Sequence, residues 1–214
     1  MFTYHKIQSI YKRDENTKHK YFIEGVYSTK EIEYLAYSLW EGTEKVDGTN
    51  IRVIYDPSYG DWQFKGKTDK AEIPVFLYDK LREIFEPVLD IVKGQFNIPV
   101  CFYGEGYGPK IQKVGNNYRK DCSFVLFDIY TAGYWLKRND IETLASELKI
   151  DVVPIVYYGN LLDAVDLCKT GFKSKWGDFT AEGLVLVPHV PLFDRMGNRI
   201  ITKIKYKDFN KGEY

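Results

Sequence analysis

Short runs of β-branched and aromatic residues, bounded by glycine and proline, most constrain how this chain folds. Residues 50–56 (NIRVIYD) and 61–67 (DWQFKGK) predict two strands joined by the turn PSYG. Similar runs predict further strands at residues 99–108, 123–130, 152–160, 182–188 and 198–209. Few of these strands alternate with helices in the βαβ manner. The pattern therefore predicts an α+β fold, built on antiparallel sheets with flanking helices on their outer faces.

Four segments carry the periodicity and end signals of helices. Residues 27–42 begin at a Ser28 or Thr29 cap and stop at Gly42. Residues 73–94 contain Pro87, which is expected to kink or split the helix. The other two helices are predicted at residues 138–150, after a cap at Asn139 or Asp140, and at residues 161–171.

Composition limits the partners and the compartment. The 214 residues suffice for one substantial domain, and 30 basic side chains cancel 30 acidic ones, so any site for a polyanion must be a local patch. The three cysteines share no ligand spacing, which argues against a disulfide framework and a zinc site. No window resembles a signal peptide or a membrane span. We expect a cytoplasmic protein without a membrane partner, in the host cytoplasm if a phage encodes it.

The segment TEKVDGTNIRV, residues 43–53, places Lys45 at an Asp-Gly turn just before a predicted strand. A lysine amine can attack phosphorus once neighbouring cations or burial favour its neutral form. The tetrapeptide Lys45–Gly48 is common, so by itself it is a weak signal. Covalent chemistry would also need cations for a phosphate, carboxylates for a metal and a pocket for a base.

Residues of these kinds follow downstream in order. Glu105 lies between two glycines, where backbone can approach a ligand closely. Phe127 precedes a carboxylate at an expected strand end, and Glu182 starts a predicted buried strand. Lys203 and Lys205 are two apart on a strand, so both are expected on one face, about 6.5–7 Å apart. Such a pair suits a phosphate.

The ordered motifs Lys-x-Asp-Gly, Gly-Glu-x-x-Gly, Phe-Asp, Glu-Gly and Lys-x-Lys resemble those of covalent nucleotidyltransferases. Between about residues 40 and 209, the sequence most resembles the phage-type ATP-dependent RNA ligases of the nick-sealing second class. The resemblance implies the ATP-grasp-like adenylation domain of ligases. It also implies a single domain over residues 1–214, with no C-terminal accessory domain.

The resemblance implies a role for each matching residue. Lys45 would form a phosphoramidate with AMP, and Lys203 and Lys205 would hold the α-phosphate. Glu182 would serve Mg²⁺ or Mn²⁺. The remaining cofactor-binding residues would be Glu44 on the adenine amino group, Asn50 near the ribose or phosphate, Glu105 on a ribose hydroxyl and Phe127 stacked on the purine. AMP would then pass to an RNA 5′-phosphate, and a 3′-hydroxyl would displace it.

Two features depart from the family pattern or extend it. Where relatives commonly carry Gly-Arg-Thr-Asp, this chain has Lys67 in place of the arginine, which keeps the charge but loses the bidentate fork. Lys67 is still expected to contact a phosphate. For RNA binding, the segment 109–121 interleaves cations with a tyrosine, and its candidates are Lys110, Lys113, Arg119 and Lys120.

Several alternatives remain open. A DNA ligase would place an arginine two residues after the Asp-Gly pair, where this chain has Asn50. A capping guanylyltransferase would need a following oligonucleotide-binding domain. A nucleotide- or RNA-binding module without catalysis, or one that depends on a protein partner, is a different class. The substrate is also open, because nicked duplex, hairpin, single strands and an RNA/DNA hybrid all fit.

Overall fold

The computed structural model describes residues 3–210, which form two compact units. Unit 1 consists of residues 3–5 and Asp47–Val153, and unit 2 consists of Lys6–Val46 and residues 154–210. Both units combine largely antiparallel sheets with a few helices, so the predicted α+β class is confirmed. The single domain over residues 1–214 stays a prediction. Among residues 3–210, no helix is long and apolar enough to cross a membrane.

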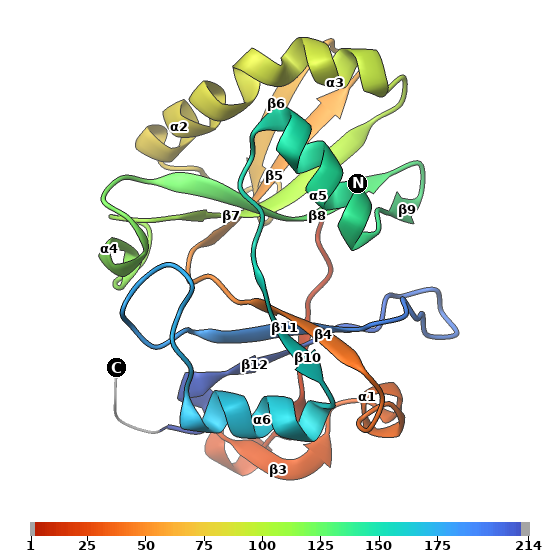
Figure 1. Cartoon of the computed structure of the whole chain (residues 1–214), viewed down its shortest axis with the longest axis vertical. Helices are drawn as coiled ribbons and strands as arrows, with labels where there is room; N and C mark the ends of the chain where they lie inside the picture. Colours follow the sequence, from red (N-terminus) through yellow and green to blue (C-terminus); the bar gives the residue numbers. More distant parts are fainter. Residues whose placement is uncertain (1–2, 211–214) are drawn as a thin grey trace. The chain divides into compact units, whose positions relative to one another are not determined.

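Unit 1 is built on a five-stranded antiparallel sheet in the order β6-β5-β7-β8-β9 (Figure 1). The strands are β5 (Thr49–Asp56), β6 (Asp61–Gly66), β7 (Val100–Tyr107), β8 (Ser123–Thr131) and β9 (Tyr134–Trp135). The turn between β5 and β6 is the predicted hairpin turn, residues 57–60. Successive side chains of a strand point to opposite faces, so Ile51, Val53 and Phe102 enter the core while their neighbours point to the other face.

Helices cover one face of this sheet. The helical elements are α2 (Val75–Phe85), the 3₁₀ turn η2 (Glu86–Val88), α3 (Leu89–Gln95), α4 (Gly115–Tyr118) and α5 (Arg138–Leu148). Apolar residues of α2, α3 and α5 share one buried cluster with alternate residues of β5, β7 and β8. In Figure 1, α2 and α3 run across that face. The break at η2 contains Pro87, so the predicted split is confirmed.

The predicted cap of α5 is wrong. The helix begins at Arg138 after an N-cap at Lys137, and Asn139 and Asp140 lie in its first turn. Arg138 donates from Nη2 to the carbonyl of Val153 at 2.6 Å, a contact that holds the first turn in place. Sequence spacing alone does not reveal this long-range contact.

Unit 2 contains a second five-stranded sheet in the order β1-β12-β11-β4-β10. The strands are β1 (Gln8–Ser9), β4 (Trp40–Glu44), β10 (Ile155–Gly159), β11 (Gly183–Pro188) and β12 (Thr202–Lys205). Only β1 and β12 pair in parallel among these described strands. A small hairpin, β2 (Tyr11–Arg13) and β3 (Phe22–Tyr27), forms a separate two-stranded sheet.

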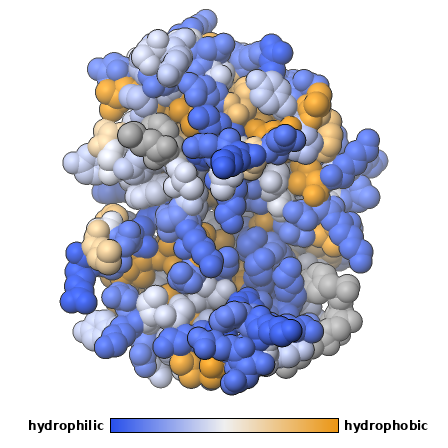
Figure 2. All heavy atoms as spheres, turned by 180° about the vertical axis from the view of Figure 1, so that it is seen from behind, coloured by the Kyte–Doolittle hydropathy of each residue, from blue (hydrophilic) through white to orange (hydrophobic). Residues whose placement is uncertain are grey.

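One face of the unit 2 sheet is covered by helix and hairpin residues. The helical elements are η1 (Glu15–Thr17), α1 (Lys30–Tyr34), α6 (Leu161–Thr170) and η3 (Tyr206–Asp208). Leu184, Leu186 and Ile204 of the sheet share a buried cluster with Leu161, Cys168 and other residues of α6. The sheet's opposite face therefore remains for polar side chains. Figure 2 shows one face of the molecule, on which hydrophilic side chains predominate and apolar ones form small groups.

The helix predicted over residues 27–42 is largely wrong. Thr29 caps α1 as expected, since its hydroxyl accepts from the Ile32 N–H, but the helix ends at Tyr34 and β4 follows from Trp40. Trp40 is 0% exposed and donates from its indole to the Leu35 carbonyl at 2.8 Å. Gly42 lies inside β4, where a Cβ would come within 3.0 Å of Leu186. Packing of the sheet overrides the local helical signal.

Candidate active site

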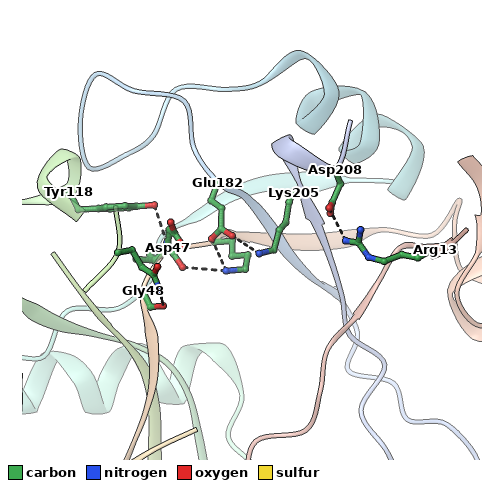
Figure 3. Close-up of polar contacts among 10 residues, drawn as sticks. Arg13, Asp47, Gly48, Tyr118, Glu182, Lys205 and Asp208 are labelled. Carbon is green, nitrogen blue, oxygen red and sulfur yellow. Dashed lines mark hydrogen bonds and ion pairs between the residues drawn. The ribbon is translucent and has the colours of Figure 1, made fainter. Parts of the chain in front are cut away.

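Lys45 lies directly after β4, where its N–H donates to the Gly183 carbonyl at 2.9 Å. Its Nζ donates to Oε2 of Glu182 at 2.6 Å, and the Nζ of Lys205 donates to Oε1 of the same carboxylate at 2.6 Å. Figure 3 shows the contact between Glu182 and Lys205. Unit 2 therefore brings together Lys45, Glu182 and Lys205, three residues that lie 137 and 23 positions apart in sequence.

Glu182 keeps its charge although its side chain is only 8% exposed. Burial disfavours the carboxylate, but attraction from Lys45 and Lys205 and their hydrogen bonds outweigh it and lower the pKa of Glu182. A buried anion with a cation on each oxygen is strongly held. Both lysine side chains are partly exposed, at 20% each.

Lys203 lies on the same face as Lys205. Both alternate with Thr202 and Ile204, each 0% exposed, as the predicted two-residue spacing requires. Lys203 pairs with Val185 of β11, and Lys205 pairs with Gly183. A phosphate group near Lys45 would therefore meet a row of cations on the face of the sheet that α6 does not cover.

The donor set fits a hard divalent cation only in part. Residues 3–210 contain no group of three or more His, Cys, Asp or Glu side chains placed to hold a metal. Mg²⁺ usually takes one or two protein carboxylates and completes its shell with waters and substrate phosphates. Glu182 can supply one such carboxylate. Both its oxygens already accept from lysines, so a metal would need those amines to move or would bind through water.

Glu44, the last residue of β4, has both carboxylate oxygens engaged inside unit 2. Oε1 accepts from the Ser174 hydroxyl at 2.6 Å, and Oε2 accepts from the Lys175 N–H at 2.8 Å. Glu44 is 1% exposed. Burial raises the pKa of Glu44, and the two hydrogen bonds and the Lys175 charge oppose that rise. Its expected contact with an adenine amino group stays a prediction.

In unit 1, three of the expected nucleotide contacts share the face that helices do not cover. Asn50 of β5 lies directly opposite Glu105 of β7, which places their Cβ atoms about 5 Å apart. The buried Oδ1 of Asn50 has no hydrogen-bond partner within residues 3–210. Because buried acceptors are normally paired, this atom is suited to a donor from a ligand.

Phe127 joins this face through a β-bulge. Tyr103 pairs with Asp128 and Gly104 pairs with Leu126, so Phe127 is the extra residue of β8. The backbone of Leu126 instead bonds to the segment 151–153. The expected position at a strand end is therefore wrong, because β8 continues to Thr131. Tyr4 contacts the half-buried Phe127 ring edge-on at 5.2 Å.

Lys67 is exposed just after β6, in a segment held by a residue that the motifs did not single out as functional. Arg52 of β5 is 1% exposed, and its Nε donates to the Gly66 carbonyl at 2.8 Å. Its Nη2 also donates to Asp69 at 2.9 Å. A lone arginine inside an apolar strand was the only sequence signal for this role. Arg52 therefore holds the Gly66 backbone before Lys67 and the Asp69 side chain after it.

The segment 109–121 contacts the turn after Lys45. The Tyr118 hydroxyl accepts from the Asp47 N–H at 3.1 Å (Figure 3). Gln112 donates to the Gly48 carbonyl at 2.9 Å. Gly48 has no room for a side chain, because a Cβ would lie 2.3 Å from the Gly106 carbonyl oxygen. The turn is therefore held within unit 1 by contacts that sequence reasoning missed.

The four expected RNA-binding cations of this segment differ in exposure. Lys110, Lys113 and Lys120 are exposed. Arg119 is half-buried, donates to Asp121 at 2.8 Å and lies over the Tyr107 ring at 5.8 Å. Arg119 is thus occupied inside unit 1, whereas the three lysines are available to a polyanion.

A family model for RNA ligase matches residues 38–206, well over half of the chain and all the motifs described above. The chain belongs to the RNA ligase family.

Solved structures of an RNA ligase from Naegleria gruberi share the fold of this RNA ligase family member. One mutant with ATP and Mn aligns with a TM-score of 0.63 at 20% identity, covering 82% of this chain and 52% of the other. A mutant with AMP and Mn gives 0.65 at 18% identity, covering 92% and 55%. The form with PPi gives 0.63 at 21% identity, covering 92% and 55%. The chain spans a little over half the length of these relatives.

Proposed function

We propose that this chain is an ATP-dependent RNA ligase that works through a covalent lysyl-AMP. The observation that carries the proposal is the arrangement around Glu182, whose carboxylate holds the amines of Lys45 and Lys205 at 2.6 Å each. Membership of the RNA ligase family and the fold shared with a ligase bound to ATP, AMP or PPi support it.

In the first step, Nζ of Lys45 attacks the α-phosphorus of ATP. A P–N bond forms, the bond from the α-phosphorus to the bridging oxygen breaks, and pyrophosphate leaves. The attacking amine must be neutral, so Lys45 has to leave its ion pair with Glu182 and lose a proton. Lys203 and Lys205 would stabilise the negative charge that develops on the α-phosphate.

In the next two steps, the AMP moves to RNA and then leaves. An oxygen of an RNA 5′-phosphate attacks the AMP phosphorus, the P–N bond breaks, and the lysine regains a proton. A 3′-hydroxyl then attacks the activated 5′-phosphorus, and AMP departs. A bound Mg²⁺ or Mn²⁺ would neutralise phosphate charge during this chemistry, with Glu182 as the carboxylate from this chain.

We assign the remaining nucleotide contacts to unit 1. Asn50 offers its unpaired Oδ1 to a ligand donor, Glu105 lies beside it for a ribose hydroxyl, and Phe127 supplies a ring for the purine. Lys67 would contact a phosphate. Under the resemblance Glu44 would select adenine, but its contacts with Ser174 and Lys175 favour another role.

The RNA substrate would carry a 5′-phosphate and a 3′-hydroxyl, with the exposed Lys110, Lys113 and Lys120 on its backbone. Arg119 would contribute only by giving up its contacts with Asp121 and Tyr107. We further propose that residues 1–214 form one functional adenylation domain that acts in the cytoplasm.

The test is end joining with ATP and magnesium on nicked duplex RNA, single-stranded RNA and an RNA/DNA hybrid, each with a 5′-phosphate at the junction. The proposal predicts a joined product on at least one RNA substrate from the wild-type protein and none from Lys45→Ala. Sealing of a DNA nick but of no RNA substrate would favour a DNA ligase. Binding of RNA without joining would favour a non-catalytic module.

A further inference from the structure

The contacts of Glu44 are inconsistent with a side chain that faces the reacting nucleotide. Glu44 pairs directly with Leu184 across β4 and β11, and opposite residues of an antiparallel pair point to the same face. Leu184 is 0% exposed and lies in the buried cluster beneath α6. The Glu44 carboxylate therefore lies on the covered face of the sheet. The ion pairs of Lys45 and Lys205 with Glu182 lie on the opposite face, because Lys205 alternates with the buried Ile204.

The partners of Glu44 belong to one loop. The 172–181 loop, which connects α6 to β11 (Figure 1), closes on itself through the Ser174 N–H to the Phe179 carbonyl and the Ala181 N–H to the Phe172 carbonyl, both at 2.9 Å. Two hydrogen bonds join this loop to the last side chain of β4, from the Ser174 hydroxyl and the Lys175 N–H to Glu44. The Ser174 hydroxyl also accepts from the Trp176 N–H at 3.1 Å.

The donor and the acceptor in each of these hydrogen bonds follow from the groups involved. An ionised carboxylate only accepts, so the Ser174 hydroxyl must donate to Glu44 while it accepts from Trp176. Charge-assisted hydrogen bonds of this kind are shorter and about twice as strong as neutral ones. The loop and the end of β4 are thus tied at a site that is almost free of water.

This tie links two residues of the proposed active site. Glu44 immediately precedes Lys45, and the 172–181 loop immediately precedes Glu182. We propose, resting on the proposed function, that Glu44 is a positioning residue: with Ser174 and Lys175 it holds Lys45 and Glu182 in register, and it does not read the base. Base selection then lies with other groups.

The test compares Glu44→Gln, Glu44→Ala and Ser174→Ala with the wild type. Label transfer from α-labelled ATP and GTP gives the maximum rate, the half-saturating ATP concentration and the ATP:GTP rate ratio. Glu44→Ala and Ser174→Ala should slow the maximum rate on the order of 10–100-fold, because a small misplacement of reacting groups has that effect. The half-saturating ATP concentration and the ATP:GTP rate ratio should stay within about threefold of wild type.

Glu44→Gln distinguishes positioning from base reading. Its amide can accept from the Lys175 N–H and donate to a rotated Ser174 hydroxyl, so the tie survives. The proposal predicts a rate within about fivefold of wild type and an unchanged ATP:GTP ratio. A carboxylate that reads the adenine amino group would instead lose its preference for ATP in this variant. The matched control is Glu41→Gln, a carboxylate on the opposite face of β4, which should behave as wild type.

Hydrogen exchange keeps the inference testable without activity. Backbone amides of the 172–181 loop should exchange faster in Glu44→Ala and Ser174→Ala, and at wild-type rates in Glu44→Gln and Glu41→Gln. A drop in the ATP:GTP ratio in Glu44→Gln, or unchanged loop exchange in Glu44→Ala, would overturn the proposal. A wild-type protein that takes no label would refute the proposed function, while the exchange data would still decide whether the tie exists.

Discussion

Replacing Lys205 with methionine tests how the Glu182 carboxylate is stabilised. The substitution keeps most of the side-chain volume and removes one charged hydrogen bond of 2.6 Å to a carboxylate that is 8% exposed. A hydrogen bond to a charged group contributes about 1.5–3 kcal/mol, and the Lys45 partner remains. Lys205→Met should therefore lower the free energy of unfolding by about 1.5–3 kcal/mol. For a chain of this size, that corresponds to a fall in Tm of about 3–12 °C.

A double-mutant cycle measures the interaction itself. Thermal unfolding would be recorded for the wild type, Lys205→Met, Glu182→Gln and the double variant. Once Glu182 is neutral, Lys205→Met should cost less than about 0.5 kcal/mol, because no buried charge is left short of a partner. An equal cost in both backgrounds, or a stabilised Lys205→Met protein, would refute the reasoning.

The same cycle has a defined pH dependence. The pKa of Glu182 is lowered in the folded protein, so the stabilisation from its ionised carboxylate is fully present above the ordinary pKa of 4.5. It is lost as the pH falls through the lower, folded-state pKa. The Lys205–Glu182 coupling should therefore be constant near neutral pH and decline below about pH 4.5.

Three further variants test the supports around the site. Arg52→Met should increase hydrogen exchange in residues 66–69 and lower the free energy of unfolding by about 1–3 kcal/mol. Arg52→Lys should restore only part of that stability, since lysine lacks the planar guanidinium fork. Gly48→Ala should slow label transfer on the order of 100-fold, because its Cβ would lie 2.3 Å from a β7 carbonyl oxygen. Tyr118→Phe should cost at most about 1 kcal/mol in unfolding but slow label transfer measurably, since the Asp47 N–H loses its acceptor.

Strands of unit 1 could be predicted from the sequence because they are runs rich in β-branched and aromatic residues. β5 and β7 are buried along most of their length, so their apolar residues form nearly continuous runs, and the turn between β5 and β6 carries its own signal. The helix split at Pro87 was predictable for a similar reason, since proline acts through its own ring.

Features that depend on distant partners could not be predicted. The bulge at Phe127 exists because Leu126 bonds to residues 151–153, and the early end of α1 follows from the packing of Trp40. Neither contact leaves a local pattern.

The candidate site also combines residues that the sequence revealed with residues that only the fold revealed. Lys45, Glu182 and the Lys-x-Lys pair were identified from ordered motifs, and unit 2 brings Lys45, Glu182 and Lys205 into direct contact. The partners Ser174 and Arg52 were not identified as such, because Ser174 is 130 residues from Glu44 and Arg52 acts on a loop 14–17 residues away. Short motifs reveal reacting groups, while the residues that hold them are found only through the fold.

The most direct test of the covalent mechanism is incubation with α-labelled ATP and magnesium, followed by a denaturing gel and peptide mapping. Our account predicts label on the protein from ATP, located at Lys45 and absent from Lys45→Ala. The labelled protein should release its AMP when pyrophosphate is added, because the first step is reversible. Absence of covalent label across metals and pH, or label that persists in Lys45→Ala, would contradict the lysyl-AMP mechanism.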